Sequence, residues 1–312
     1  LIAVGFLAMA LASFAGAAAD GFVLLLASRV LEGFGFIVVA STAPPMFLAV
    51  SAPRHHRLIF GLYSGYWPAG VAVMILVTPV VLDAIGWRGL WILNGGLALG
   101  VLALLLLVTH GTSPRHVASN PPPFLDALRT FTRIGPMTVA LTFGTYSSIH
   151  VTVVALLPTF YTEVGALSLG LASLLTALVT VMNVGGNIAA GVAMHRGAPR
   201  WVLVVGTFVL IAISAMLMYD DGLTFNTRLA AAIFLSFIAG MIPACLFAET
   251  QIVAPSPKLV GATTGLMMQG SQLGQLVGPV SMAWVVTYSG SWDFAPVTIV
   301  TAAVIGIMLM LL

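Results

Sequence analysis

Two ionisable residues lie inside an apolar stretch near the beginning of the chain. Arg29 and Glu32 occur between positions 21 and 50, where the other side chains are uncharged. An arginine at membrane depth costs about 2.5–3.5 kcal/mol on insertion scales, so it normally faces a protein interior or a wet cavity. Glu32 follows three residues later on the same helical face, where its carboxylate can partly neutralise the guanidinium. The pair predicts either a structural ion pair between helices or a charged patch in a transport pathway.

Glu32 and His150 are ionisable side chains in apolar stretches whose protonation could change. The charge of a carboxylate or an imidazole at such a place responds to burial, to nearby charges and to the opening of a cavity. Glu32 lies beside Arg29, and a bound anion could change the balance between the two. His150 lies fourteen residues into an apolar stretch that begins at Pro136, deep enough to titrate in a cavity. A hydrogen bond between helices explains His150 equally well.

Further polar and aromatic residues in apolar stretches are candidates for contact with a substrate. The two asparagines are four residues apart and the two glutamines three, so each pair shares one face of a helix. The tyrosines, with Trp67, could form an aromatic wall of a cavity. Substrate binding and helix packing remain open alternatives for all of them. These candidates are Tyr63, Tyr66, Tyr146, Asn183, Asn187, Gln269 and Gln272.

The composition determines the class of protein. The chain has 312 residues, of which 60% are hydrophobic and only 6% charged, and its mean hydropathy is +1.11. These values are far from those of soluble domains and predict an all-α, polytopic membrane protein. A net charge of +2 is too small to indicate nucleic-acid binding, and the single Cys245 cannot form a disulfide within the chain.

Other functional classes lack the residues they need. An ATP-driven pump would need a phosphate-binding Gly-rich loop with Lys and a soluble nucleotide domain, and the sequence has neither. His55 and His56 are too few to predict a metal site. We therefore expect no enzyme, no cofactor and no metal. A channel is less favoured, because channels usually form a pore by symmetric assembly.

Ten apolar stretches are long enough to cross a membrane as helices. A polar, proline-rich interval divides them into two groups and predicts an N-terminal bundle over residues 1–109, a linker over 110–135 and a six-helix bundle over 136–312. Both ends of the chain lie in apolar sequence, so we expect a fragment of a longer protein. The stretches are 1–19, 22–50, 59–82, 90–108, 136–161, 167–193, 201–219, 229–253, 260–288 and 295–312.

A weak internal repeat supports two related halves. The segment 61–70 resembles 265–274, and Pro53 corresponds to Pro257 at the same offset of 204 (257 − 53). Parallel repeats of this kind are typical of transporters built from two helical halves. Six glycines are predicted to be positions of close helix packing: Gly61, Gly65, Gly70, Gly270, Gly274 and Gly278.

Loop charges predict the orientation. Eight of the eleven Lys and Arg residues fall on one side of the predicted spans, whereas Arg88 and Arg228 fall on the other. The positive-inside rule places the linker in the cytoplasm and the protein in a bacterial-type inner membrane. The eight residues are Arg54, Arg57, Arg115, Arg129, Arg133, Arg196, Arg200 and Lys258.

Several motifs resemble those of the major facilitator superfamily. Arg29-Val-Leu-Glu-Gly-Phe-Gly35 is similar to the motif of its fourth helix, where the residue at Glu32 is often Gln. Gly191-Val-Ala-Met-His-Arg-Gly-Ala-Pro-Arg200 resembles the loop motif between the second and third helices of each half. Gly86-Trp-Arg-Gly-Leu-Trp91 matches the entry to the sixth helix, and Gly270 to Pro279 resembles a packing motif of glycines and proline. The resemblance covers the whole chain.

The resemblance implies helices three to twelve of a twelve-helix fold, with the first two missing, and alternating access around a site near the membrane midplane. Coupling of such transport to protons would need a titratable group, for which Glu32 and His150 are the candidates. It also implies an inner gate. His195 stands where the family usually has aspartate in the loop motif, and Arg196, Arg200 and Glu249 are the other predicted gating residues, with Glu249 a partner of one of the two arginines.

The sequence therefore predicts a secondary transporter of small solutes. Arg29, Glu32 and the prolines at 44 and 45 most resemble anion and metabolite permeases of the cyanate-permease type, which implies proton-coupled uptake. The alternative is a proton-coupled multidrug efflux antiporter, because an arginine at position 29 is common there too. We expect a monomer whose partners are membrane lipid, a small-molecule substrate and protons, and no nucleic acid.

Overall fold

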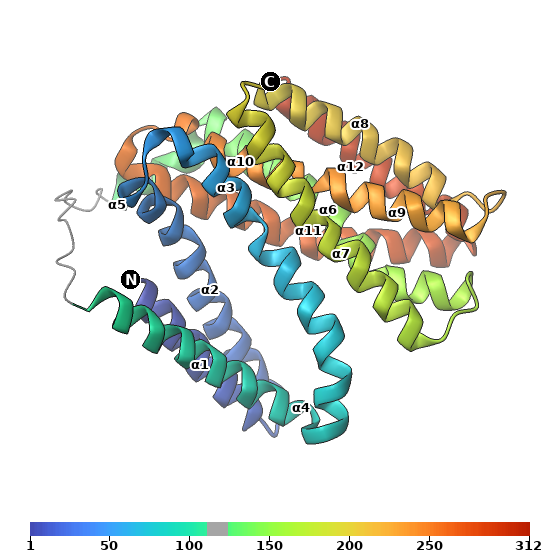
Figure 1. Ribbon diagram of the computed structural model, residues 1–312, viewed down its shortest axis with the longest axis horizontal. Helices are drawn as coiled ribbons and strands as arrows, with labels where there is room; N and C mark the ends of the chain where they lie inside the picture. Colours follow the sequence, from blue (N-terminus) through green and yellow to red (C-terminus); the bar gives the residue numbers. More distant parts are fainter. Residues whose placement is uncertain (111–123) are drawn as a thin grey trace. The chain divides into compact units, whose positions relative to one another are not determined.

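The computed structural model describes residues 1–110 and 124–312 and is built of α-helices (Figure 1). Within these residues no strand is assigned. Short 3-10 turns precede several helices: η1 Pro53–His55, η2 Thr130–Thr132, η3 Pro257–Leu259 and η4 Trp292–Phe294. The helices are α1 Ile2–Ala17, α2 Phe22–Val50, α3 His56–Ser64, α4 Tyr66–Thr109, α5 Phe124–Arg129, α6 Ile134–Glu163, α7 Leu169–His195, α8 Arg200–Tyr219, α9 Phe225–Ala239, α10 Met241–Val253, α11 Val260–Ser289 and α12 Ala295–Met310.

All ten predicted apolar stretches fall on helices, which confirms the all-α prediction. Seven helical segments of the described residues are long and apolar enough to cross a membrane. One of them, Leu58–Thr109, joins two predicted stretches, which meet at Gly86 with a φ of 68°. Helix α1 is apolar but has only 16 residues, and α11 has 30 residues with many Gly, Ser, Thr and Gln side chains.

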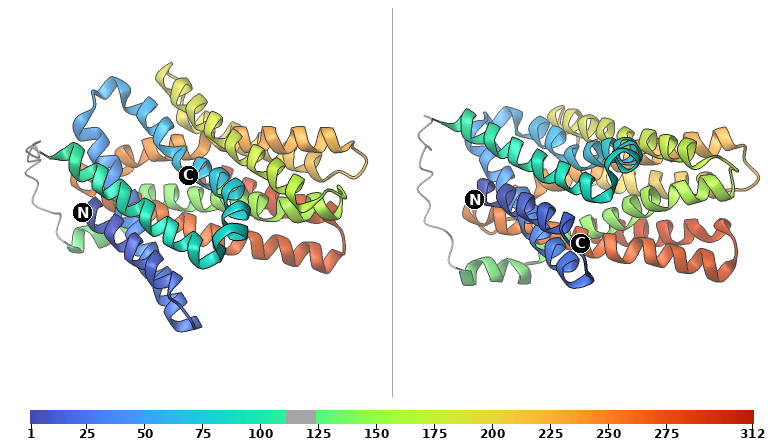
Figure 2. Two further views of the ribbon diagram at one scale, coloured as in Figure 1. Left: turned by 60° about the horizontal axis from the view of Figure 1, so that its bottom comes forward. Right: turned by 90° about the horizontal axis from the view of Figure 1, so that it is seen from below.

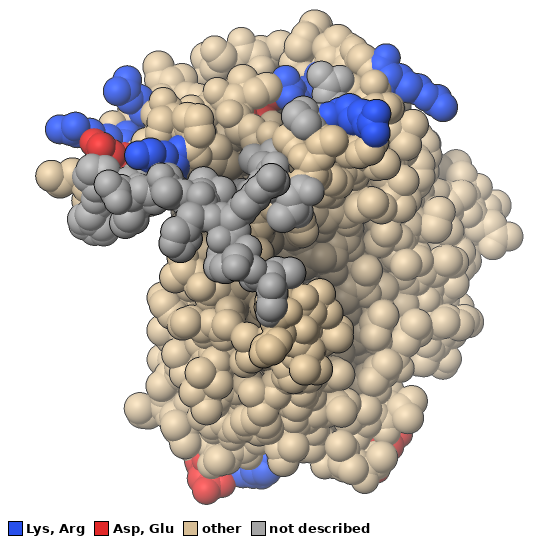
Figure 3. Space-filling view, turned by 60° about the vertical axis from the view of Figure 1, so that its left-hand side comes forward, with Lys and Arg blue, Asp and Glu red and all other residues tan. Residues whose placement is uncertain are grey.

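The outer surfaces of the helices are apolar. Leu107 on α4 and Leu276 on α11 are examples of large apolar side chains that are largely exposed. Most of the face in Figure 3 belongs to residues other than Lys, Arg, Asp and Glu. Exposed apolar area on this scale is unfavourable in water and suits contact with lipid tails.

The chain forms two compact units. The first comprises Leu1–Val50 and Val77–Pro122, and the second Ser51–Leu76 and Pro123–Leu312. Half of the predicted linker, residues 111–123 with Arg115, lies outside the described residues, and its described part contains α5 and η2. The division into two bundles at residues 109 and 136 stays a prediction.

In the first unit, glycines bring α1 and α2 into contact. Gly5 and Gly35 face one another, and a Cβ built on Gly35 would lie 2.6 Å from the carbonyl oxygen of Gly5. Gly16 is equally enclosed, because a Cβ there would overlap the ring of Trp91 on α4. Small residues let helix backbones approach closely where lipid provides no hydrophobic driving force.

In the second unit, α6 and α11 form the most extensive helix pair, and the views of Figure 2 show the second unit from two further sides. Gly270, Gly274 and Gly278 on α11 lie against the backbone of Ala140, Gly144 and Ser148 on α6. Gly61 on α3 similarly faces Gly191 on α7. These close contacts confirm the predicted packing role of the glycines, except at Gly70. A Cβ at Gly70 would meet no atom within 4 Å, so the packing prediction is wrong there.

Gly274→Ala is expected to destabilise the second unit, because the added Cβ would overlap the carbonyl oxygen of Gly144. Forcing extra atoms into a packed interface costs about 1–3 kcal/mol. Gly265→Ala on the same helix is the matched control, since a Cβ there would meet no atom within 4 Å. Thermal unfolding of the purified protein in detergent measures both variants. Equal melting temperatures for the two would show that α11 can move away from α6 at little cost.

Local geometry recurs along the chain. The 3-10 turns that begin at Pro53 and Pro257 are 204 residues apart (257 − 53). Gly86 and Gly290, also 204 apart (290 − 86), both have positive φ, at 68° and 70°, which is unfavourable for residues with a Cβ. Their ψ angles are 179° and 10°, so the position of the glycine recurs but the turn itself does not. These recurrences support the internal duplication inferred from the sequence.

Candidate functional site

His150, near the middle of α6, is the centre of a buried polar and aromatic cluster in the second unit. Its side chain is 1% exposed. The imidazole stacks on Tyr146 with 5.6 Å between ring centroids, and Trp67 of α4 contacts it edge-on at 5.7 Å. Nε2 lies 3.5 Å from the hydroxyl of Ser236 on α9. Nδ1 has no hydrogen-bond partner among the described residues, so the ring retains a nitrogen that can exchange a proton.

Asn183 and Asn187 on α7 extend the cluster on its polar side. The amide of Asn183 donates to the carbonyl oxygen of Ser236 at 3.0 Å and lies 3.5 Å from the hydroxyl of Tyr146. The amide of Asn187 donates to the main-chain and side-chain oxygens of Asn183, both at 2.9 Å. Both asparagines are fully buried, and the Oδ1 of Asn187 has no partner among the described residues.

Glycine makes this proximity possible. A Cβ on Gly186 of α7 would overlap the carbonyl oxygen of Phe237, and one on Gly240 would overlap that of Asn183. The backbones of α7 and α9 are therefore in direct contact, which brings the amide of Asn183 within reach of Ser236. A buried amide needs such partners, because an unmade hydrogen bond costs about 1–3 kcal/mol.

A strip of aromatic rings connects the cluster to the surface of the second unit. Between ring centroids, Tyr66 is 5.2 Å from Tyr63, and Tyr63 is 5.1 Å from Phe247 of α10. The centroid of Phe247 is in turn 5.9 Å from that of Phe143 on α6. Phe143 stacks on Tyr146 at 5.5 Å. Tyr66 is 36% exposed whereas Tyr146 is buried. The rings thus form an unbroken series of contacts from the partly exposed Tyr66 to the buried His150.

Most members of this cluster were predicted from the sequence, but three were not. Ser236, Phe143 and Phe247 contribute a hydroxyl, a carbonyl oxygen and two rings. Ser236 offered a usable signal, as a polar residue inside an apolar stretch. Phe143 and Phe247 offered no such signal, because a phenylalanine in an apolar stretch looks the same in the sequence whether it faces lipid or a cavity.

Gln269 and Gln272 are not joined to the cluster by any hydrogen bond of the described residues. Both are exposed on α11. The opposite face of that helix carries Gly270 and Gly274, which pack on α6. The structure thus places the two glutamines away from the α6 contact.

Arg29 and Glu32 form an ion pair in the first unit. The guanidinium carbon lies 3.8 Å from the ring centroid of Trp91, a cation–π contact. Nε is 3.4 Å from the hydroxyl of Ser28, and Nη2 is buried without a hydrogen-bond partner among the described residues. The two charged side chains are 38% and 30% exposed, so they are partly enclosed by protein.

The predicted gating residues divide into a pair and two exposed side chains. Nε of Arg200 lies 2.7 Å from Oε2 of Glu249, so the structure gives Glu249 one of the two arginine partners expected. His195 and Arg196 are exposed, and neither forms an ion pair within the described residues. Their role in gating stays a prediction.

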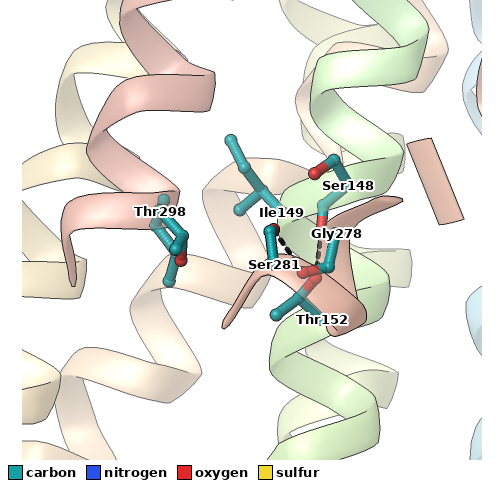
Figure 4. Close-up of a pocket in the computed structure, with 7 residues that line it drawn as sticks. Ser148, Ile149, Thr152, Gly278, Ser281 and Thr298 are labelled. Carbon is teal, nitrogen blue, oxygen red and sulfur yellow. Dashed lines mark hydrogen bonds between the residues drawn. The ribbon is translucent and has the colours of Figure 1, made fainter. Parts of the chain in front are cut away.

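A small polar niche lies between α6, α11 and α12 (Figure 4). It is lined by the hydroxyls of Ser148, Thr152, Ser281 and Thr298, and its volume of about 10 Å³ leaves room for about one water molecule. Ser281 donates to the carbonyl oxygen of Gly278 at 2.8 Å, as Figure 4 shows. In the described part of the chain, no three His, Cys, Asp or Glu side chains gather as metal ligands do.

Solved structures with a similar fold are transporters. The human organic anion transporter MFSD10 (TETRAN) matches with a TM-score of 0.77 and 15% identity, over 99% of this chain and 76% of that one. A variant of the E. coli fucose:proton symporter FucP matches with a TM-score of 0.74 and 14% identity, over 99% of this chain and 82% of that one. FucP in the outward conformation matches with a TM-score of 0.75 and 13% identity, over 99% of this chain and 81% of that one. At these identities the likeness concerns the fold alone.

The sequence itself identifies the family. No curated protein sequence matches this chain. The family model of the Major Facilitator Superfamily matches residues 1–279, which includes the Arg29 motif and the glycines of α11. With the predicted motifs, the helical fold and this match in agreement, the chain belongs to the major facilitator superfamily, a family of multi-pass membrane proteins that act as secondary transporters of small molecules.

Proposed function

We propose that the protein takes up a small anion or anionic metabolite together with protons, by alternating access, in a bacterial-type inner membrane with its linker in the cytoplasm. The observation that carries the proposal is His150, which is 1% exposed on a membrane-spanning helix and has a nitrogen without a partner among the described residues. A titratable residue at this depth is by default functional rather than structural.

The surroundings of His150 suit proton transfer. Imidazole is the side chain whose ordinary pKa lies nearest to physiological pH. Tyr146, Asn183 and Ser236 supply hydroxyl and amide groups around it. A substrate that approached along the aromatic strip would change the hydration of the ring, and so the balance between its neutral and charged forms. Substrate and proton would then bind in a linked way, as coupling requires.

Arg29 supports an anionic substrate. One of its nitrogens has no hydrogen-bond partner among the described residues, although Glu32 and Trp91 hold the rest of the guanidinium. Arginine suits carboxylates and other planar anions, because its fork of N–H groups can donate two parallel bonds. Among the similar structures, MFSD10 is described as an organic anion transporter and FucP as a proton symporter, and the proposal combines these two properties.

A second function is proton-coupled efflux of lipophilic cations. The observation that favours it is the aromatic strip from Tyr66 to Tyr146, because ring faces attract cations. The two functions differ in the direction of flux and in the sign of the charge on the substrate.

Flux measurements in proteoliposomes test the proposal. The full-length protein is reconstituted and exposed to labelled cyanate and small carboxylates, with and without an inward proton gradient. We expect saturable uptake that the gradient drives above equilibrium and a proton ionophore abolishes. Saturable, gradient-driven flux of lipophilic cations with no anion uptake would support efflux instead. Flux that rises linearly with concentration and shows no exchange would indicate a channel.

A further inference from the structure

Arg228 is a buried cation without an internal anion. It lies in the first turn of α9, and its side chain is 7% exposed. None of the ion pairs in the described residues includes it, and its Nε has no hydrogen-bond partner there. A guanidinium is always charged, and a buried charge is strongly unfavourable unless it is paired.

The acidic groups near this end of the second unit are largely engaged elsewhere. Glu163 accepts a hydrogen bond from the indole of Trp292 at 2.9 Å. Asp220 accepts one from the main-chain nitrogen of Gly222 at 2.9 Å. Asp221 is exposed, and it lies beyond ion-pair distance of Arg228. The protein therefore does not neutralise Arg228 from within its described residues.

Tyr161 is a second buried group that lacks a partner. It lies in the last turn of α6, eleven residues after His150, which is roughly 16 Å along a helix, so it is separate from the central cluster. Its ring is 1% exposed and lies 5.6 Å from that of Phe225. Its hydroxyl forms no hydrogen bond within the described residues.

Arg228 and Tyr161 line the same cavity, which has a volume of about 410 Å³. Pockets for small ligands range over roughly 300–1,000 Å³. Aromatic and aliphatic side chains form much of the wall, among them Phe160, Leu223 and Phe225, and Asp221 contributes the one carboxylate. The cavity thus combines a buried cation, a hydroxyl and an accessible anion with an apolar wall.

We propose that this cavity binds a zwitterion, whose anionic group pairs with Arg228 and Tyr161 and whose ammonium group faces Asp221. A dianion would be repelled by Asp221, and a simple cation would be repelled by Arg228. Two sources share this chemistry. One is the headgroup of phosphatidylethanolamine, whose tails would continue along the apolar surface. The other is a free amino acid in solution.

Binding is tested on the full-length protein with both sources as probes. Phosphatidylethanolamine retained by the protein is measured by native mass spectrometry, with phosphatidylglycerol, which lacks the ammonium group, as the reference lipid. Alanine at millimolar concentration is tested by thermal shift in detergent. We expect Arg228→Gln to weaken binding of the active probe about tenfold or more, because the bond to the anion is charge-assisted. Tyr161→Phe should weaken it severalfold.

Arg88→Gln is the matched control, because Arg88 already pairs with Asp20 at 2.8 Å and should not affect the cavity. If the protein retains phosphatidylethanolamine and alanine does not raise its melting temperature, the ligand is the lipid headgroup. If only alanine raises the melting temperature, the ligand is a free amino acid. If neither probe binds, or if Arg228→Gln binds as well as the wild type, the proposal is wrong. Should that variant fail to fold, Tyr161→Phe alone decides, and equal binding to the wild type refutes the site.

Discussion

In His150→Asn, accumulation driven by a proton gradient is expected to fall to the level of protein-free liposomes, whereas exchange of labelled for unlabelled substrate continues. Asparagine cannot carry a proton, and its amide reaches only as far as the inner ring atoms of histidine, so the contact at 3.5 Å between Nε2 and the Ser236 hydroxyl is lost as well. The loss of the ring contact with Tyr146 should cost only about 0.5–1.5 kcal/mol of stability. Counterflow and gradient-driven uptake in the same proteoliposomes separate the two activities.

His110→Asn is the control for this result, because His110 is exposed at the end of α4. We expect it to transport as the wild type does. If His150→Asn also accumulates substrate normally, His150 is a packing residue and the coupling proton must bind elsewhere, with Glu32 the next candidate. If both exchange and accumulation disappear together, His150 contacts the substrate directly.

In Arg29→Gln, uptake of the anionic substrate is expected to need about 10- to 100-fold more substrate to reach half its maximal rate. The estimate follows from the loss of a charge-assisted hydrogen bond, which contributes about 1.5–3 kcal/mol. Glutamine can still pack on Trp91 but offers no positive charge. Initial rates of labelled anion uptake over a range of concentrations measure the change.

Arg88→Gln is a close control for Arg29→Gln. Arg88 also lies over a tryptophan, 4.3 Å from the ring centroid of Trp87, and also pairs with a carboxylate, that of Asp20. Removing it repeats the loss of an ion pair and a cation–π contact without removing Arg29. A similar loss of uptake in both variants would mean that Arg29 acts through stability. Unchanged export of lipophilic cations in cells with Arg29→Gln would favour the efflux function.

The helices were predictable because lipid requires long apolar segments. The predicted stretch 22–50 coincides with α2. The junction at Gly86 was predicted too, because Asp83 and Arg88 interrupt the apolar sequence between the stretches 59–82 and 90–108. In the structure both spans belong to one helical segment, Tyr66–Thr109, with the reversal at Gly86.

The site was predictable in its polar members. His150, Tyr146 and Asn183 stood out as polar groups at membrane depth, and they lie together. The glutamines of α11 were harder to place, because their polarity does not say which face of the helix they occupy. The glycines do: Gly270 and Gly274 pack on α6 and so mark the packed face, and Gln272 lies on another face.

The recurrence of the 3-10 turns has a consequence for where the charged residues lie. At the offset of 204 that separates these turns (257 − 53), Arg29 corresponds to Ile233 and Glu32 to Ser236. Neither counterpart is charged: Ile233 is apolar, and Ser236 contributes a buried hydroxyl to the His150 cluster. The two halves therefore share a backbone plan but not the same polar side chains. We expect a protein built from two copies of the second half to keep the architecture and to lose the ion pair of Arg29 and Glu32.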